Sequence, residues 1–318
     1  MSARAPRADD SAGDPPSTVP LDAVEARWER SIPLPELTPT FLAEHLAPWP
    51  ELAGRSWSVL SGGLRSLNLR SADLVLRIAL DGRGSLQKER ALLELARGFV
   101  RVPRVLGASA RALLLEHVPH APLPATAEAG RQAGRAAARI HTHAFPRAGM
   151  LDARLQVVEP FETSWSGLRG WAEQLLGAQA GARLGPERVQ AIERVWAEHE
   201  AALLAECAAP VLVHADFKPT NVKWLPDEAD VLVLDWEFAW AGPALFDVGQ
   251  LLRWQPPEPF VAGVEQGLRE GQAPLPPDWR RLAELLDLFN LVGFLDHAED
   301  RPQRDRDVLG RIDRTLRA

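Results

Sequence analysis

The sequence is almost without cysteine: Cys207 is the only one among 318 residues. A single thiol excludes an internal disulfide framework, and it excludes a zinc site built from cysteines, because both need at least two. Any metal ion that the protein binds must therefore rest on oxygen or histidine ligands.

Long apolar runs are missing as well. No apolar stretch approaches the roughly 20 residues that a helix needs to cross a bilayer. The first 17 residues, MSARAPRADDSAGDPPS, also lack the apolar core of a signal peptide. These absences predict a cytoplasmic protein that has no membrane partner.

Basic charge is in deficit. The formal net charge is -7, from 36 Lys and Arg against 43 Asp and Glu. Nucleic-acid sites need a basic surface, so this balance argues against nucleic acid as a partner and suits a cationic or neutral small molecule better. Only three of the basic residues are lysines and 33 are arginines. We interpret this excess as a coding bias without functional meaning.

The chain is long enough to bury a large core. With 318 residues, of which 46% are hydrophobic, it can form two domains or one large bilobal domain. Residues 1–20 are rich in Ala, Pro, Ser and Asp without periodicity, which predicts a disordered tail. We place an N-terminal lobe at residues 21–116 and a C-terminal lobe at residues 117–318, and we expect a monomer.

The period of the hydrophobic pattern changes along the chain. Helical patterns cover residues 21–30 and begin again at Thr38-Pro39, where a capping residue precedes proline. A period of two then predicts strands at 57–60, 67–70, 74–78, 102–106 and 112–116, with a helix at 87–98. After residue 119, helices are predicted at 126–143, 166–181, 186–206, 260–271 and 278–299.

Polar residues that follow two short apolar runs interrupt this helical half. The run PVLV leads into HADFKPTN, residues 214–221, and the run VLVL leads into Asp235. Both runs are typical of buried strands, which would deliver Asp216, Asn221 and Asp235 to one edge of a sheet.

These three side chains are the set that phosphoryl transfer requires. The reaction needs a carboxylate to orient the attacking hydroxyl and oxygen ligands to hold Mg²⁺ on the phosphates. Asp216 would accept the hydroxyl's hydrogen bond, while Asn221 and Asp235 would bind Mg²⁺. Loop Asp and Asn residues more often cap helices or form turns. The hypothesis therefore depends on the whole arrangement of strand, HxDxKPxN, strand and Asp.

This arrangement resembles the aminoglycoside phosphotransferase and choline kinase family, which shares a bilobal fold with the protein kinases. HAD at 214–216 with Asn221 matches the catalytic loop of that family, and LDWE at 234–237 matches its magnesium-binding segment. FDVG at 246–249 looks like the segment whose aspartate braces the catalytic loop. The resemblance runs from about residue 57 to about residue 254. It implies an α+β fold, with a small antiparallel-sheet N-lobe carrying one helix and a larger, mainly helical C-lobe.

The resemblance also implies a phosphate-binding lobe before the catalytic loop. Gly62 and Gly63 would form a turn that lets the backbone approach phosphate oxygens, although an ordinary tight turn has the same pattern. Arg77 lies on the third strand, where kinases place a cation for the α- and β-phosphates, and Glu89 on the next helix would pair with it. The family often has lysine at this position. Arginine keeps the charge but brings a planar fork and different geometry.

Other residues take their roles from the same resemblance. Glu116 and Val118 fall where the linker between the lobes offers backbone groups to adenine. Lys218 could neutralise charge on the transferring phosphoryl group, or it could be a solvent-facing loop lysine. His214 is expected to hold the loop backbone, and His141 resembles the buried helix histidine of the family.

The sequence thus predicts a kinase that uses ATP or GTP with Mg²⁺ and phosphorylates a hydroxyl of a small molecule. Aminoglycoside, choline-like, ketosamine and homoserine-like acceptors all remain open. The acceptor pocket is expected near residues 160–175 and 250–300. Tryptophans there could face sugar rings or a quaternary amine, and acids could hold ammonium groups, but most of these acids are expected to be ordinary solvated helix faces. In and near these segments stand Trp165, Trp171, Trp240, Trp254, Trp279, Glu258, Asp278, Glu284, Asp287 and Asp296.

Two alternatives belong to other functional classes. A catalytically silent, nucleotide-binding pseudokinase or regulatory module would bind ATP without turning it over. A protein kinase would need an activation segment and an APE-like motif after Asp235, and neither is recognisable in the sequence.

Overall fold

The computed structural model describes residues 28–30, 32–60, 66–80 and 86–317. Gly62 and Gly63, the predicted phosphate-binding turn, lie outside the described residues. Of the helix predicted over residues 21–30, the last three residues are described and are not helical. Two of them contact the C-lobe instead: Trp28 packs against Trp254, and Glu29 accepts backbone hydrogen bonds from residues 303 and 304.

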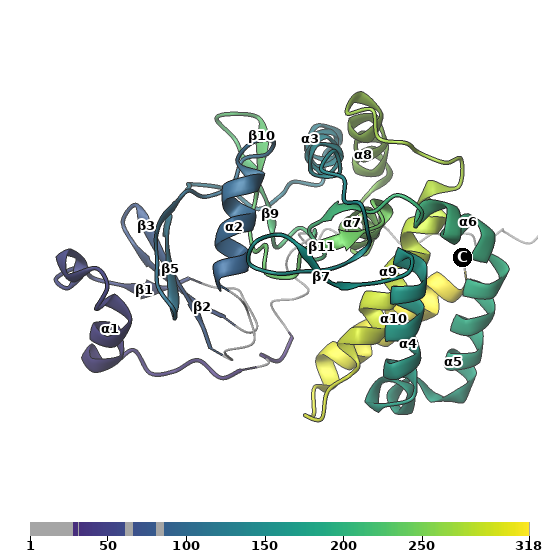
Figure 1. Ribbon diagram of the computed structural model, residues 1–318, viewed down its shortest axis with the longest axis horizontal. Helices are drawn as coiled ribbons and strands as arrows, with labels where there is room; N and C mark the ends of the chain where they lie inside the picture. Colours follow the sequence, from purple (N-terminus) through teal and green to yellow (C-terminus); the bar gives the residue numbers. More distant parts are fainter. Residues whose placement is uncertain (1–27, 31, 61–65, 81–85, 318) are drawn as a thin grey trace, which may run out of the picture.

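The N-lobe is an antiparallel sheet of five strands in the order β1-β2-β3-β5-β4. The strands are β1 (Ser58–Val59), β2 (Ser66–Ser71), β3 (Leu74–Ala79), β4 (Val105–Ala108) and β5 (Ala112–Glu116). Helix α1 (Pro39–Leu46) begins where predicted, because the Thr38 hydroxyl accepts from the Phe41 amide at 3.1 Å. It is followed by a short 3₁₀ turn at Pro50–Leu52. Helix α2 (Leu86–Ala96) packs against β4 and β5 (Figure 1).

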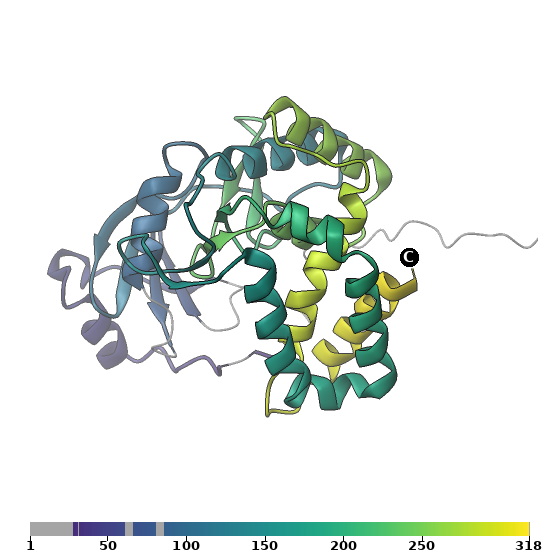
Figure 2. The ribbon, with the colours of Figure 1, turned by 45° about the vertical axis from the view of Figure 1, so that its right-hand side comes forward.

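The C-lobe is mainly helical. Its helices are α3 (Ala127–Ile140), α4 (Ser164–Leu176), α5 (Gln179–Glu198), α6 (Glu200–Glu206), α7 (Leu245–Leu252), α8 (Glu258–Glu270), α9 (Trp279–Phe294) and α10 (Pro302–Arg317). The helix predicted over 186–206 is two helices, and the part of α5 after the kink at Gly185 (φ +75°) starts at the predicted proline. Helices α4, α5, α9 and α10 lie against one another on the side away from the N-lobe (Figures 1 and 2).

Sequence patterns did not predict α7 and α10. Helix α7 is buried on almost all sides, so it lacks the polar face that marks an amphipathic helix, and it has no capping side chain. Helix α10 is the opposite case: its buried face includes Arg304 and Arg311 beside Val308 and Ile312. Arginine stems fill apolar positions there, which hides the helical pattern of hydrophobic residues.

The two apolar runs around the catalytic motif are strands, but they belong to different sheets. Strand β8 (Val211–Val213) pairs with β11 (Trp240–Gly242) in a four-stranded sheet that also holds β6 (Gly149–Leu151) and β7 (Val157–Pro160). Strand β10 (Asp230–Val233) pairs with β9 (Val222–Leu225). The prediction of a single sheet edge is therefore wrong. Side-chain and backbone hydrogen bonds between the two loops bring the polar residues together, and local patterns do not encode such contacts.

A continuous hydrophobic core lies under the helices of the C-lobe and reaches α2. Within this core the Trp196 and Phe289 rings stack with centroids 4.2 Å apart. Within the described part of the chain, no helix combines the length and the apolar character that crossing a bilayer requires.

Candidate active site

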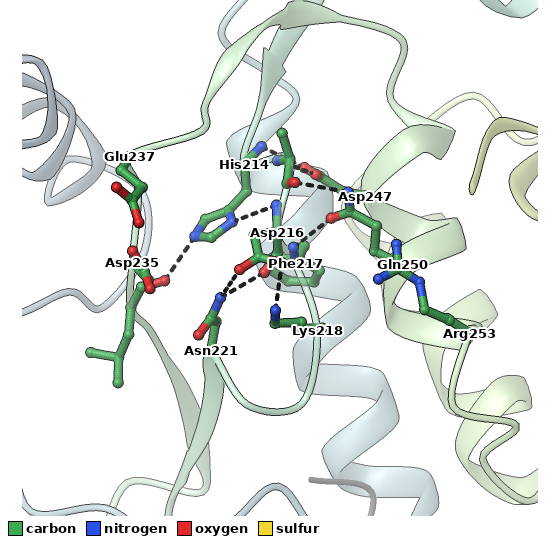
Figure 3. A network of polar contacts seen from close by, with 12 residues as sticks. His214, Asp216, Phe217, Lys218, Asn221, Asp235, Glu237, Asp247, Gln250 and Arg253 are labelled. Atoms are coloured by element: carbon green, nitrogen blue, oxygen red, sulfur yellow. Dashed lines mark hydrogen bonds and ion pairs between the residues drawn. The ribbon is translucent and has the colours of Figure 1, made fainter. Parts of the chain in front are cut away.

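The loop after β8 holds Asp216 between two neighbours from the same motif (Figure 3). The Lys218 ammonium lies 2.8 Å from Asp216 Oδ1. The Asn221 amide donates to Asp216 Oδ2 at 2.7 Å and to the Asp216 carbonyl at 3.0 Å. Burial raises the pKa of Asp216, but the charge and hydrogen bond of Lys218 outweigh it, so the pKa lies below its ordinary value. The carboxylate is therefore ionised and can accept a proton or a hydrogen bond.

Helix α7 fixes the backbone of this loop through Asp247. The Asp247 carboxylate accepts from the amides of His214 and Ala215, both at 2.8 Å, and it lies 3.0 Å from His141 Nε2. Asp247 is fully buried. Ala215 has a positive φ of +63°, a conformation that costs free energy and persists where surrounding contacts hold it.

A second residue of α7 extends this support. Gln250 accepts from the Phe217 amide at 2.6 Å and donates to the Ala215 carbonyl at 2.8 Å (Figure 3). Sequence reasoning missed Gln250. It stands three residues after Asp247, so both side chains leave the same face of one helix. This spacing is the signal that could have found it.

The imidazole of His214 links the catalytic loop to the segment after β10. Its Nε2 lies 2.9 Å from the Leu234 carbonyl, and its Nδ1 lies 3.2 Å from the Asp216 amide. A backbone amide can only donate, so Nδ1 accepts and Nε2 carries the proton. Both ring nitrogens are used in backbone contacts, which agrees with the prediction that His214 holds the loop and leaves the base role to Asp216.

Arg77 connects the N-lobe to the Asp235 segment. Its guanidinium forms the predicted pair with Glu89 at 2.8 Å, and it also contacts Ser66 Oγ at 3.2 Å. It further lies 2.5 Å from Asp235 and 3.3 Å from Glu237, contacts that the sequence did not predict. Burial alone would lower the pKa of Arg77, but the three carboxylates raise it above its ordinary value. The cation thus stays charged in a site where it is 5% exposed.

The predicted magnesium ligands offer oxygen atoms at the same place. The side-chain nitrogen of Asn221 donates to Asp216, so the side-chain oxygen of Asn221 can bind another partner. Asp235, held at a positive φ of +65°, and Glu237 add carboxylates from the neighbouring segment. Hard oxygen donors of this kind suit Mg²⁺. Within the described ranges, no group of three or more His, Cys, Asp or Glu residues has by itself an arrangement that could hold a metal ion.

One cleft of about 2300 Å³ between the lobes is lined by Arg77, Glu89, Asp216, Lys218, Asn221, Asp235 and Glu237. The bracing residues His214, Asp247 and Gln250 do not line it. Glu116 and Val118, the predicted adenine linker, also line it. The Val118 carbonyl lies 2.7 Å from His120 Nδ1, and the Glu116 side chain pairs with Arg104 at 3.1 Å. The structure therefore brings every described residue of the predicted site to a single cavity.

The chain matches the model of the phosphotransferase enzyme family over residues 56–285. It belongs to this family. The resemblance drawn from the HADFKPTN motif is thereby confirmed. No match is found among curated protein sequences.

Solved structures of other phosphotransferases share the fold. A choline/ethanolamine kinase family protein from Mesorhizobium loti has 20% sequence identity and a TM-score of 0.64, over 87% of this chain and 94% of that one. An aminoglycoside phosphotransferase with bound ADP has 18% identity and a TM-score of 0.61, over 85% and 96%. A macrolide 2'-phosphotransferase from Brachybacterium faecium has 19% identity and a TM-score of 0.56, over 79% and 91%. The predicted α+β, protein-kinase-like fold is confirmed.

The structure brings only some of the residues expected at the acceptor pocket to the cleft. Trp171 and Trp240 line the cleft, but Trp165, Trp254 and Trp279 are buried in the hydrophobic core. Among the named acids, Asp296 lines the cleft. Three others form ion pairs elsewhere, namely Asp287 with Arg253, Glu258 with Arg280 and Glu284 with Arg281. Asp278 stands at the start of α9.

Several lining residues come from outside the predicted segments. Trp28 and Arg30 reach the cleft from the N-terminal stretch, and Arg301 and Arg304 reach it from the start of α10. No local pattern marks these positions, because only the tertiary fold brings residues 28–30 and 301–304 together.

Proposed function

We propose that this protein is a Mg²⁺-dependent kinase that transfers the γ-phosphoryl group of ATP or GTP to a hydroxyl of a small molecule. The observation that supports this most directly is the environment of Asp216. Its carboxylate is kept ionised by Lys218, is oriented by Asn221, and shares one cleft with the Arg77–Glu89 pair and Asp235. Phosphoryl transfer uses these groups for positioning and for charge stabilisation.

In the proposed reaction, the acceptor oxygen forms a bond to the γ-phosphorus while the bond to the β–γ bridging oxygen breaks. Asp216 accepts the hydrogen bond of the hydroxyl and takes up its proton as the new bond forms. Lys218, already 2.8 Å from Asp216, is placed to orient the carboxylate and to offset negative charge on the transferring group.

Asn221, Asp235 and Glu237 are the residues proposed to hold Mg²⁺. When bound, the ion would neutralise charge on the phosphate oxygens. Arg77 would add a fixed positive charge from the N-lobe. Its ion pairs with Glu89 and Asp235 hold the guanidinium in place before the nucleotide binds. Nucleotide binding therefore costs little side-chain entropy at Arg77.

The test is the Asp216→Asn variant, which keeps the shape of the side chain and removes its capacity to take a proton. We expect ADP formation with a hydroxyl acceptor to fall by about 10²- to 10⁴-fold, the usual size of general-base catalysis. The affinity for ATP with Mg²⁺, measured by calorimetry, should be nearly unchanged. A comparable loss of ATP affinity would contradict the assignment of Asp216 to the hydroxyl.

An experiment on the wild-type protein tests the alternative of a catalytically silent pseudokinase. A screen for ADP formation across amino sugars, amino alcohols, sugars and hydroxy acids should find turnover with at least one acceptor. ATP binding without turnover across that screen would favour a nucleotide-binding pseudokinase.

A further inference from the structure

Two buried arginines at the start of α10 line the cleft. Arg301 directly precedes the helix and Arg304 lies in its first turn. Their residues are 6% and 5% exposed, and both line the cavity that contains Asp216 and Lys218. Arginine is seldom buried to this extent unless an anion compensates its charge.

Arg304 has no such partner within the described part of the chain. Its Nε is buried without a hydrogen-bond acceptor, and its guanidinium takes part in none of the ion pairs found among the described residues. Burial lowers the pKa of Arg304 to about 10, and the neighbouring charge of Arg301 contributes. The acids Asp305, Glu29 and Glu299 act in the opposite direction and do not compensate.

Each of these acids is already engaged by another group. Asp305 lies 3.2 Å from Arg183 and 2.8 Å from His297. Glu299 pairs with Arg301 at 3.1 Å, and its side chain is 62% exposed.

Glu29 binds backbone and not the guanidinium. Its carboxylate accepts from the amides of Gln303 and Arg304 at 3.0 and 3.2 Å, so it caps the start of α10. Asp296, which also lines the cleft, is exposed to solvent, and water screens its charge. A buried positive charge on the wall of the cleft thus remains uncompensated.

We propose that Arg304, together with Arg301, is an anion subsite of the acceptor cleft, and that the acceptor alcohol carries an oxyanion, either a carboxylate or a phosphate monoester. This inference rests on the proposed kinase function, because it names the acceptor class of that site. A planar guanidinium binds both oxyanions with paired, charge-assisted hydrogen bonds. The aromatic rings of Trp171 and Phe294, which also line the cleft, offer apolar surface to the rest of the molecule.

The first experiment measures binding and does not require turnover. Calorimetric titrations compare matched compounds: gluconate and glucose 6-phosphate with glucose, glycerate and glycerol 3-phosphate with glycerol, and glucosamine as the cationic counterpart. We expect one anionic compound or more to bind about ten- to a hundredfold more tightly than its neutral partner. The carboxylate and phosphate series separate the two oxyanion sources. Equal or stronger binding of the neutral or cationic compounds in every series would overturn the proposal.

The variants locate the effect. Arg304→Gln should remove the preference for the anion, while Arg304→Lys should retain part of it because the charge remains without the fork. Arg306→Gln is the matched control, since Arg306 is exposed on the same helix and its loss changes the net charge equally. An equal loss of anion binding in Arg304→Gln and Arg306→Gln would show a general charge effect and would overturn the subsite.

Thermal unfolding distinguishes a binding role from a structural one. Arg304→Gln removes a buried charge that lacks a partner, so its Tm in buffer should not fall below that of Arg306→Gln. A large drop in Tm together with weaker ATP binding would instead assign Arg304 to the fold.

Assays of ADP formation then separate this proposal from the proposed function. If a neutral or cationic acceptor is phosphorylated and Arg304→Gln leaves its KM unchanged, the anion subsite is wrong and the kinase function stands. If Arg304→Gln abolishes anion binding but no acceptor is phosphorylated, the subsite stands and the kinase function fails.

Discussion

At the scale of single residues, Arg77 shows how a departure from the common family pattern is accommodated. Lysine would have to reach both carboxylates from one ammonium nitrogen, whereas Arg77 contacts Glu89 through Nε and Asp235 through a terminal nitrogen of its planar fork. Because Glu89 is only 2% exposed, removing its cation alone would leave a buried charge without compensation. Simple truncation of Arg77 therefore combines two effects, lost stability and lost nucleotide binding.

The double variant Arg77→Met/Glu89→Gln separates these effects. Arg77→Ala should lower the free energy of unfolding by about 3–5 kcal/mol. The double variant, which removes the buried charges of Arg77 and Glu89 at similar volume, should recover part of this loss, because Asp235 and Glu237 lose Arg77 in both variants. Both should weaken ATP binding by about ten- to a hundredfold, because the phosphates lose a charged partner, while adenosine binding stays unchanged. Urea unfolding and titrations with both ligands provide the measurements. Equal losses for ATP and adenosine would remove Arg77 from the phosphate site.

Glu206 makes stability depend on pH. It lies at the end of α6, where burial raises its pKa to about 7 although the Leu245 amide donates to it at 3.2 Å. Below about pH 4.5, the glutamate is protonated in both the folded and the unfolded protein. Between about pH 4.5 and 7 the folded protein retains a proton that the unfolded chain releases, so stability falls as pH rises. Above about pH 7 the folded protein has released this proton as well, so Glu206 causes no further fall in stability.

We therefore expect Glu206→Gln, which keeps the hydrogen-bond acceptor and cannot ionise, to be more stable than the wild type at pH 8. The difference should reach at most about 3 kcal/mol and should shrink toward zero near pH 4.5. Urea unfolding of both proteins at pH 5, 6, 7 and 8 measures this difference in the free energy of unfolding. A difference that does not vary with pH would show that the effect comes from packing.

At the scale of elements, helices α3 and α8 pack closely because each presents glycines to the other. A Cβ added at Gly134 would stand 2.3 Å from the Val264 carbonyl oxygen, and one at Gly267 would stand 2.0 Å from that of Arg131. Gly130 and Gly263 make similar contacts. Glycine is unfavourable inside a helix, so its presence at four facing positions has a packing reason.

Gly134→Ala should thus destabilise the protein by about 1–3 kcal/mol, because the backbones must separate, even though alanine favours the helix. Gly310→Ala is the matched control: it also lies in a helix, α10, and the nearest atom to its added Cβ is an Arg314 guanidinium nitrogen at 3.8 Å. This variant should be neutral or more stable, by up to about 1 kcal/mol. Thermal unfolding of both variants checks the prediction, and equal Tm changes would refute it.

At the scale of the whole molecule, the N-terminal stretch joins the two lobes. Trp28 is 5% exposed and packs against Trp254 and Phe294 of the C-lobe, with ring centroids 6.2 and 5.3 Å away. Arg30 donates to the Ser66 carbonyl of the N-lobe sheet at 3.1 Å. The stretch also borders the cleft. It therefore restrains the distance between the lobes at this edge of the cleft.

Trp28→Ala should lower the free energy of unfolding by about 3–5 kcal/mol, since a buried aromatic side chain is lost from a packed cluster. Trp171→Ala serves as the control, because Trp171 is 39% exposed and should contribute much less to stability. Denaturant unfolding gives both values. A loss for Trp28→Ala no larger than that for Trp171→Ala would mean that the stretch is not part of the cooperative fold.

The sequence by itself determined the family, the α+β class and the core of the candidate site. This was possible because Asp216, Lys218 and Asn221 share one short loop, and because the strands and helices of the N-lobe follow local hydrophobic periods and capping signals. The pairing of Arg77 with Glu89 also followed from the resemblance, and the structure shows it at 2.8 Å.

Only the tertiary structure decided what depends on contacts between distant parts of the chain. It brought Arg77 to Asp235, 158 residues away, and Glu29 to the start of α10, more than 270 residues away. It placed Arg301 and Arg304 in the wall of the cleft and moved three predicted tryptophans into the core. Burial and charge compensation decide these roles, and both depend on which residues meet in space. No local pattern carries that information.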